Sequence, residues 1–132
     1  MIFSLVVYSA PHAGESAATA VRFARALVDQ GHRLYRVFFY GDGVHSGSAL
    51  AAPPQDEQDL LGQWQALYRE HGVDLVVCIA AAQRRGVLSQ SEAQRLERPA
   101  ANLAEGFELG GLGQLADATA HSDRIVTFGG SA

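Results

Sequence analysis

The residue of this sequence best suited to covalent chemistry is its single cysteine, Cys78. It follows the apolar run Leu75–Val77 and precedes Ile79 and three alanines, which predicts a buried strand that changes into a helix at the cysteine. In an open parallel α/β sheet such a junction lies at the carboxyl edge, where ligands and reacting groups gather. The N–H groups of the helix start, with Arg84 and Arg85 nearby, favour the thiolate, which is the nucleophilic form of cysteine.

The sequence leaves two other interpretations of Cys78 open. A cysteine between Val77 and Ile79 also fits a small buried core residue, so its reactivity depends on access. In addition, five residues separate Cys78 from Arg84, which is the spacing of the phosphate-binding loop in cysteine-dependent phosphatases. That loop wraps an oxyanion with backbone N–H groups and usually contains glycine, whereas residues 79–83 favour a helix.

Four further residues near predicted strand ends could orient or activate the thiol: Tyr8, His12, Tyr40 and His45. Their residue types alone favour ordinary loop positions over catalytic roles. The histidines are scattered, without a pair at metal-ligand spacing, so the sequence predicts no metal site. The glycine-rich stretch 110–113 precedes a predicted helix and could accept an anion, but it lacks the dinucleotide fingerprint, and no cofactor is predicted.

Length and composition predict a single globular domain over residues 1–132. The chain is 48% apolar and 18% charged, and no apolar run approaches the roughly 20 residues of a membrane span. The formal net charge of −4 argues against direct binding to nucleic acid. A single cysteine excludes an internal disulfide, which fits a reducing cytoplasm, and the first residues are typical of a strand and not of a signal peptide.

Hydrophobic periodicity predicts strands that alternate with helices. The predicted strands are Ile2–Tyr8, Leu34–Tyr40, the run ending at Cys78, Arg124–Phe128 and a candidate fifth near Phe107. The predicted helices are Ser16–Gln30, Asp56–His71, 80–85, a capped helix from Ser89 to Glu97, and Leu112–Ala120. This alternation predicts a three-layer α/β/α fold with a mostly parallel sheet of four to five strands. The loops Ser9–Glu15 and Gly41–Pro54 then emerge at the same edge as Cys78, and residues 129–132 form a flexible tail.

Four segments of the chain resemble the DsrE/TusD sulfurtransferases. They are Val37–Val44, Pro53–Asp56, Val76–Gly86 and Gly111–Leu115. The resemblance extends from the first predicted strand to Phe128, its most specific part is the segment around Cys78, and it is weakest in the first loop, Ser9–Glu15. It implies a DsrE-like fold for the single domain and a cytoplasmic persulfide carrier whose functional cysteine is Cys78.

The family resemblance also implies partners and a place in sulfur metabolism. TusD-like proteins assemble with TusB-like and TusC-like subunits as a dimer of heterotrimers. They accept sulfur from a TusA-like donor and pass it to a TusE-like acceptor, and the sulfur ends in the 2-thiouridine of tRNA wobble positions. This relay needs neither a metal nor an organic cofactor, and it implies no direct contact with nucleic acid or with a membrane.

Three alternatives stay open beside this relay role. One is a DsrE-type sulfur carrier in dissimilatory sulfur oxidation, and another is a non-catalytic structural subunit of the same assembly in which Cys78 is buried. The third is an α/β module that binds a small molecule or phosphate with the loops after Tyr8 and Tyr40. In the relay, Arg84 and Arg85 are expected to be solvated or to hold a partner subunit, because a helix carries them at least one turn beyond the cysteine.

Overall fold

Strands and helices alternate along the chain in the computed structural model, which describes residues 1–130. The strands are β1 (Ile2–Val7), β2 (Arg33–Phe39), β3 (Asp74–Cys78), β4 (Phe107–Gly110) and β5 (Arg124–Phe128). The α-helices are α1 (Ser16–Asp29), α2 (Leu60–His71), α3 (Ile79–Arg84), α4 (Gln90–Arg95) and α5 (Leu112–His121), and η1 (Gly41–Gly47) is a 3₁₀-helix. Across residues 1–130 the strands form one sheet in the order β4-β3-β2-β1-β5, with each neighbouring pair parallel. The predicted α/β class is confirmed, and the candidate strand near Phe107 is part of the sheet.

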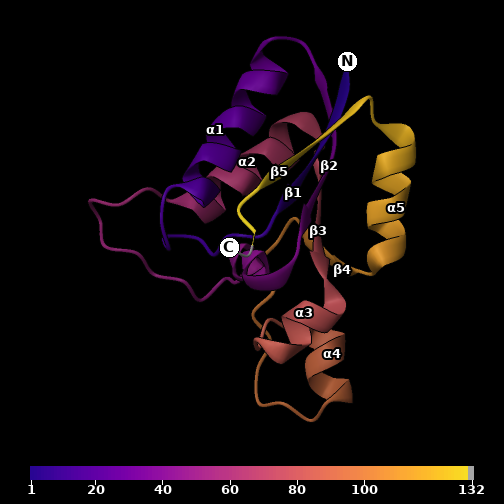
Figure 1. Ribbon diagram of the computed structural model, residues 1–132. Coiled ribbons are helices and arrows are strands. Elements are labelled where there is room, and N and C mark those ends of the chain that lie inside the picture. The colour runs from indigo at the N-terminus through magenta and orange to yellow at the C-terminus, as the bar shows by residue number, and fades with distance from the viewer. Residues whose placement is uncertain (131–132) are drawn as a thin grey trace.

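The sheet is covered on both faces, which confirms the three-layer α/β/α arrangement (Figure 1). Helices α1 and α2 lie together on one face and α5 lies on the other, while α3 and α4 extend beyond the carboxyl end of β3. On the α1 and α2 face, the buried rings of Phe39 and Trp64 pack edge-on with centroids 5.2 Å apart. Phe38, the residue before Phe39 on β2, is buried against the opposite face. Burial on both faces explains why the central strands are nearly continuous apolar runs.

The carboxyl ends of β1, β2 and β3 lie at one edge of the sheet, as predicted from their parallel order. The chain leaves β2 through η1, although the sequence predicts only a long loop over 41–54. Gly43 of η1 lies so close to β1 that a Cβ there would overlap the carbonyl oxygen of Val7. Helix η1 also contacts α3 and β3, so it packs between these elements at the edge where β1 and β3 end.

The second predicted helix starts later than expected. It begins at Leu60 and not at Asp56, because the Asp59 carboxylate accepts a hydrogen bond from the N–H of Gly62 at 2.9 Å and caps the helix there. Asp56 and Glu57 therefore precede α2, and its first turn contains no acidic residue.

Helix α4 begins as predicted, with the Ser89 hydroxyl accepting a hydrogen bond from the N–H of Glu92 at 3.3 Å. The Glu92 carboxylate binds Arg95 instead of completing the capping box, and the helix ends at Arg95. The predicted tail over 129–132 falls partly on residues 131–132, which lie outside the described residues. Within residues 1–130, none of the helices has the length and apolar character needed to cross a lipid bilayer.

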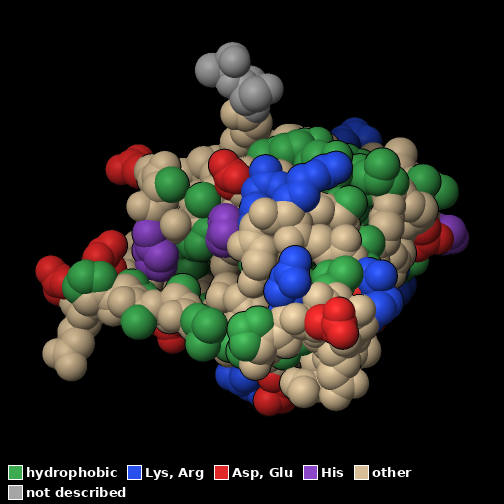
Figure 2. Space-filling model, turned by 90° about the horizontal axis from the view of Figure 1, so that it is seen from below, with side chains coloured by type: hydrophobic (Ala, Val, Ile, Leu, Met, Phe, Trp, Pro, Cys, Tyr) green, Lys and Arg blue, Asp and Glu red, His purple; other side chains and the backbone are tan. Residues whose placement is uncertain are grey.

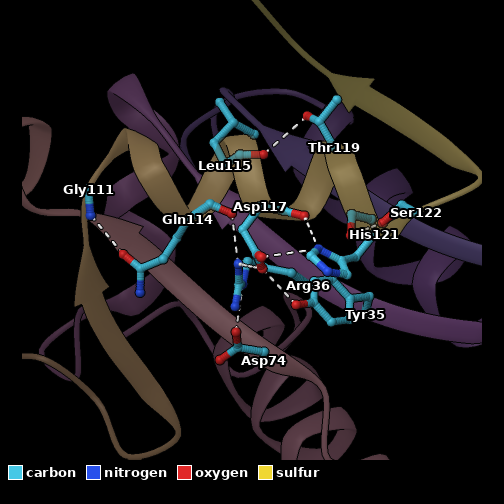
Figure 3. Close-up of polar contacts among 11 residues, drawn as sticks. Tyr35, Arg36, Asp74, Gly111, Gln114, Leu115, Asp117, Thr119, His121 and Ser122 are labelled. Atoms are coloured by element: carbon cyan, nitrogen blue, oxygen red, sulfur yellow. Dashed lines mark hydrogen bonds and ion pairs between the residues drawn. The ribbon is translucent and has the colours of Figure 1, made fainter.

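A polar cluster fastens α5 to the sheet, with the Arg36 guanidinium of β2 at its centre (Figure 3). Its Nε donates to Asp74 at 2.6 Å, and Nη1 donates to Asp117 at 3.0 Å and to the Gln114 carbonyl at 2.7 Å. The Tyr35 hydroxyl donates to the same Asp117 carboxylate at 2.6 Å. These contacts, with the Tyr35 hydrogen bond as the largest cause, hold the pKa of Asp117 below its usual range. Charge-assisted hydrogen bonds thus hold α5 in place together with apolar packing.

The ionised carboxyl of Glu108 on β4 destabilises this cluster, because it lies beside the Asp74 carboxyl. A hydrogen bond to Asp74 raises the pKa of Glu108, and burial raises it further. The folded state therefore binds this proton more tightly than the unfolded chain does, so stability falls as the pH rises above the ordinary value of 4.5. We expect Glu108→Gln to increase the free energy of unfolding at neutral pH, by less than about 1 kcal/mol because solvent screens the site.

Chemical denaturation at neutral pH and near pH 4 measures this effect. The gain should shrink at the lower pH, where the carboxyl of the parent chain is largely protonated in both states. Glu105→Gln, which removes the charge of an exposed glutamate just before β4, is the matched control. An equal gain in both variants would show that total negative charge, and not the pairing with Asp74, is responsible.

Candidate active site

Cys78 is the last residue of β3 and the N-cap residue of α3, as the sequence predicts. Its backbone is still extended, with φ −61° and ψ 119°, and the helix begins at Ile79. Across the sheet it lies opposite Gly110 of β4. Because side chains alternate between the two faces along a strand, Cys78 shares its face with Val76. The packing of Gly110 identifies this face.

Gly110 allows α5 to pack closely against the sheet. A Cβ at this position would overlap the side chain of Gln114 and would lie only 2.7 Å from Cγ1 of Val76. The side-chain oxygen of Gln114 accepts a hydrogen bond from the N–H of Gly111 at 2.8 Å, which holds the first turn of α5 beside β4. Val76 and Cys78 therefore lie on the α5 face of the sheet.

The thiol is far less accessible than an open nucleophile. Cys78 has a relative exposure of 3%, and Val76 and Val77 before it have 0%. Cys78 therefore lies at the margin of the hydrophobic core, and its thiol is not openly reachable in the isolated chain. The alternative interpretation, a small buried core residue, describes its packing correctly. In this conformation the surface of Cys78 open to a sulfur donor is therefore small.

The two arginines that follow the thiol have different surroundings. Arg85 turns back toward η1, where its Nε donates to the Asp42 carboxylate at 2.8 Å and its Nη1 donates to the Ala81 carbonyl at 3.1 Å. The hydrogen bond from Arg85 lowers the pKa of Asp42 and ties α3 to η1. Arg84 is exposed and forms no ion pair with any residue of 1–130. The sequence does not reveal Asp42 as a partner, because 43 residues separate it from Arg85.

A cleft of about 600 Å³ opens at the carboxyl edge beside Arg85. Its lining comes from the ends of β1, β2 and β5 and from η1 and α3: Tyr8, Tyr40, Gly41, Asp42, Arg85, Thr127, Gly129 and Gly130. The rings of Tyr8 and Tyr40 meet edge-on with centroids 5.6 Å apart. The structure thus brings Tyr8, Tyr40 and Arg85 together, but Cys78 is not part of the lining.

His12 and His45 meet in a second, much smaller pocket at this edge. They line it together with Ser46, between the first loop, η1 and the start of α2. Within residues 1–130 neither histidine hydrogen-bonds to Cys78, so this structure contains no histidine–thiol pair. In the same range, no group of three or more histidine, cysteine or acidic side chains is arranged to hold a metal ion.

The geometry of α3 limits the chemistry that Cys78 can do. Residues 79–84 form a helix and not a loop that wraps an anion, so the phosphatase interpretation of the Cys78–Arg84 spacing is wrong. One reaction open to a cysteine thiolate at such a position is nucleophilic attack by its sulfur on another sulfur atom. Such exchange requires a thiolate and access, without a metal or a general base fixed beside it.

Comparison with known proteins gives close relatives along nearly the whole chain. Residues 1–128 match the model of the DsrE/DsrF-like family. The chain is 50% identical to a protein of Pseudomonas aeruginosa named sulfurtransferase TusD homolog, with 98% of each covered. It is 46% identical to sulfurtransferase TusD of Salmonella enteritidis, covering 97% of this chain and 100% of the relative. It is 41% identical to the putative sulfurtransferase DsrE of Allochromatium vinosum, covering 98% and 99%.

A solved structure supports the same assignment. The crystal structure of the ychN protein of E. coli has a TM-score of 0.81 to this chain at 26% identity, covering 97% of this chain and 99% of that one. The family resemblance inferred from the segments around Tyr40 and Cys78 is therefore confirmed, and so is the DsrE-like fold. Relatives at 41% to 50% identity share the name sulfurtransferase. The chain belongs to the DsrE/DsrF-like family and is a sulfurtransferase.

Proposed function

We propose that this sulfurtransferase is a relay subunit that carries sulfur as a persulfide on Cys78. One observation supports this assignment above all. Cys78 is the only cysteine in the sequence, and it ends a strand at the carboxyl edge of the sheet in a chain whose relatives are named sulfurtransferases. A relay that moves sulfur through protein persulfides needs a thiolate on each protein that carries the sulfur, and no other side chain of this chain supplies one.

The transfer consists of two exchange steps at sulfur. In the first, the Cys78 thiolate attacks the terminal sulfur of a donor persulfide, so that a new Sγ–S bond forms and the donor leaves as a thiolate. In the second, an acceptor thiolate attacks the terminal sulfur on Cys78, and Cys78 is released as a thiolate. Each step breaks one S–S bond and makes another, so neither step needs an external oxidant or reductant.

The names of the relatives support a particular relay. TusD proteins are similar to this chain at 46% to 50% identity, so we assign it to the TusD-like role: sulfur arrives from a TusA-like donor and leaves to a TusE-like acceptor for 2-thiouridine formation in tRNA. TusB-like and TusC-like chains complete the assembly, as a dimer of heterotrimers in the cytoplasm. The DsrE relative, at 41% identity, supports the alternative of a carrier in dissimilatory sulfur oxidation.

Access to the thiol is the most demanding requirement of this proposal. Cys78 is 3% exposed, and α3, the six-residue helix that follows it, is tied to η1 by the pair between Arg85 and Asp42. We propose that a docked donor or companion subunit displaces α3 enough to expose Sγ. The burial of Cys78 also favours a second candidate function, a non-catalytic structural subunit in which this cysteine only fills the core.

Mass spectrometry of the intact protein separates these two functions. After exposure of the assembled complex to a persulfide donor, we expect this chain to gain the mass of one sulfur atom at Cys78 and to lose it again on treatment with a reductant. The rate of alkylation by iodoacetamide, compared with that of free cysteine, measures access in the isolated chain and in the complex. A complex in which Cys78 gains no sulfur and is alkylated no faster than in the isolated chain would support the structural subunit.

A further inference from the structure

The segment that follows Cys78 carries a charge opposite to that of the remaining chain. Residues 79–102, which include α3 and α4, contain four arginines and two glutamates. The remaining residues contain six arginines and twelve acidic residues. The sequence contains no lysine. Apart from the N-terminus and protonated histidines, arginine therefore carries every positive charge of the chain. We call Arg84, Arg85, Arg95 and Arg98 the α3–α4 basic surface.

Two of these four arginines are neutralised within the chain and two are not. Arg85 pairs with Asp42 at 2.8 Å, and Arg95 pairs with Glu92 at 2.6 Å. Arg84 and Arg98 are exposed and form no ion pair with another residue of the described part of the chain. In the view from the end where α3 and α4 lie, arginine side chains (blue) spread across the middle of the surface (Figure 2).

Arg98 is held at the end of α4 by a defined backbone motif. Glu97 has a left-handed φ of 55°, which is a conformation that favours glycine. The N–H of Arg98 donates to the carbonyl of Ala93 at 2.8 Å, and the N–H of Glu97 donates to that of Gln94 at 3.2 Å. This is the Schellman arrangement of a helix end. The Arg98 side chain therefore starts from a fixed backbone and not from a frayed terminus, and its Nη1 donates to the Leu96 carbonyl at 3.1 Å.

One member of the α3–α4 basic surface, Arg84, lies within electrostatic range of the thiol. Arg84 is the last residue of α3, and six residues of α-helix rise about 9 Å from Cys78. This distance is close to the screening length of about 8 Å at physiological ionic strength. A partner that delivers sulfur to Cys78 therefore approaches a locally cationic surface on a chain with a net charge of −4.

We propose that the α3–α4 basic surface docks a protein that presents its cysteine persulfide among acidic side chains. This inference rests on the proposed function. Complementary charge raises the association rate and fixes the orientation in which the two sulfur atoms meet. An acidic protein fits better than RNA. A phosphate backbone needs many cationic contacts, whereas only Arg84 and Arg98 lack an acidic partner here and the rest of the chain is strongly acidic.

Two short peptides test this proposal. Each carries one cysteine persulfide, flanked by glutamates in one and by serines in the other, and the assembled complex is the target. At low salt we expect sulfur to reach Cys78 about tenfold faster from the acidic peptide, with the advantage disappearing at high salt. The double variant Arg84→Glu/Arg98→Glu should lose the preference, so that the ratio of its transfer rates from the acidic and the serine peptide is close to one. Arg69→Glu, an exposed charge reversal on α2, is the matched control and should keep the preference.

A binding measurement separates failure of this proposal from failure of the proposed function. Fluorescence anisotropy of the acidic peptide without its persulfide reports docking alone. Salt-sensitive binding that the double variant loses, without sulfur uptake from either peptide, would support the docking surface and overturn the carrier role of Cys78. Uptake at equal rates from both peptides, or a preference unchanged in the double variant, would overturn the docking surface. Binding of tRNA that depends on Arg84 and Arg98 would assign the surface to RNA and overturn the proposal that it docks an acidic protein.

Discussion

Cys78→Ser is expected to abolish transfer of sulfur from donor protein to acceptor protein while leaving the fold and the assembly intact. A serine hydroxyl is not ionised at neutral pH and forms no persulfide, so both exchange steps are lost together. Serine is close in size to cysteine, and the position lies at the margin of the core with 3% exposure, so we expect a loss of stability of only about 1 kcal/mol. Transfer of labelled sulfur from the proposed TusA-like donor to the proposed TusE-like acceptor measures the effect.

A relocated thiol is the matched control for this substitution. The double variant Cys78→Ser/Ser91→Cys keeps one cysteine in the chain but moves it to an exposed position on α4. It should react rapidly with iodoacetamide and still fail to pass sulfur between the two proteins. If Cys78→Ser alone retained transfer, the carrier role would have to be given up in favour of the structural subunit.

Arg36→Met should have the largest effect on stability, a loss of about 3 kcal/mol in the free energy of unfolding. The methionine preserves the apolar stem of the side chain but removes hydrogen bonds to Asp74, Asp117 and the Gln114 carbonyl. The Arg36 side chain is only 13% exposed, so water cannot replace these bonds well. Asp74, Asp117 and Glu108 then lose the cation that offsets their mutual repulsion. Urea denaturation followed by circular dichroism measures the loss.

The pH dependence of this loss identifies its origin. The lowered pKa of Asp117 means that its contribution to stability is present above the ordinary value of 3.8 and disappears as the pH falls through its lower value in the folded state. The difference between Arg36→Met and the parent chain should therefore be largest at neutral pH and smaller in acid. Arg33→Met, on the same strand but exposed and without an acidic partner among residues 1–130, should change stability by less than about 0.5 kcal/mol. Equal losses in both variants would contradict the special role of Arg36.

The local elements of this fold could be predicted from the sequence because their signals are local. Apolar runs mark β1, β2 and β3, and the glycine at position 72 ends α2 with a left-handed φ of 64°. The strand order could not be predicted in the same way, because it depends on pairings such as β1 with β5 between opposite ends of the chain. The start of α2 was misplaced for a related reason. Three acidic residues lie together there, and only the position of Gly62 shows that Asp59 is the one that caps.

The candidate site shows the same limit. The change from β-branched residues to alanine located Cys78 at a strand-to-helix junction, and the structure confirms that position. Its burial was only one of the interpretations that the sequence left open, because burial depends on packing between elements such as β3 and η1 that come from distant parts of the chain. The pair between Arg85 and Asp42 was missed for the same reason, since no periodicity connects residues so far apart in sequence.

The late position of α5 and β5 in the chain has a consequence for synthesis of the protein. While the ribosome is still making residues 112–128, the residues of strands β1–β4 and of helices α1 and α2 have already been synthesised, but the face that holds Phe38 and Val76 has no helix to cover it. The nascent chain therefore presents a bare apolar surface until α5 has emerged. A chain truncated before Leu112 should consequently aggregate or bind chaperones, although it contains Cys78 and four of the five strands.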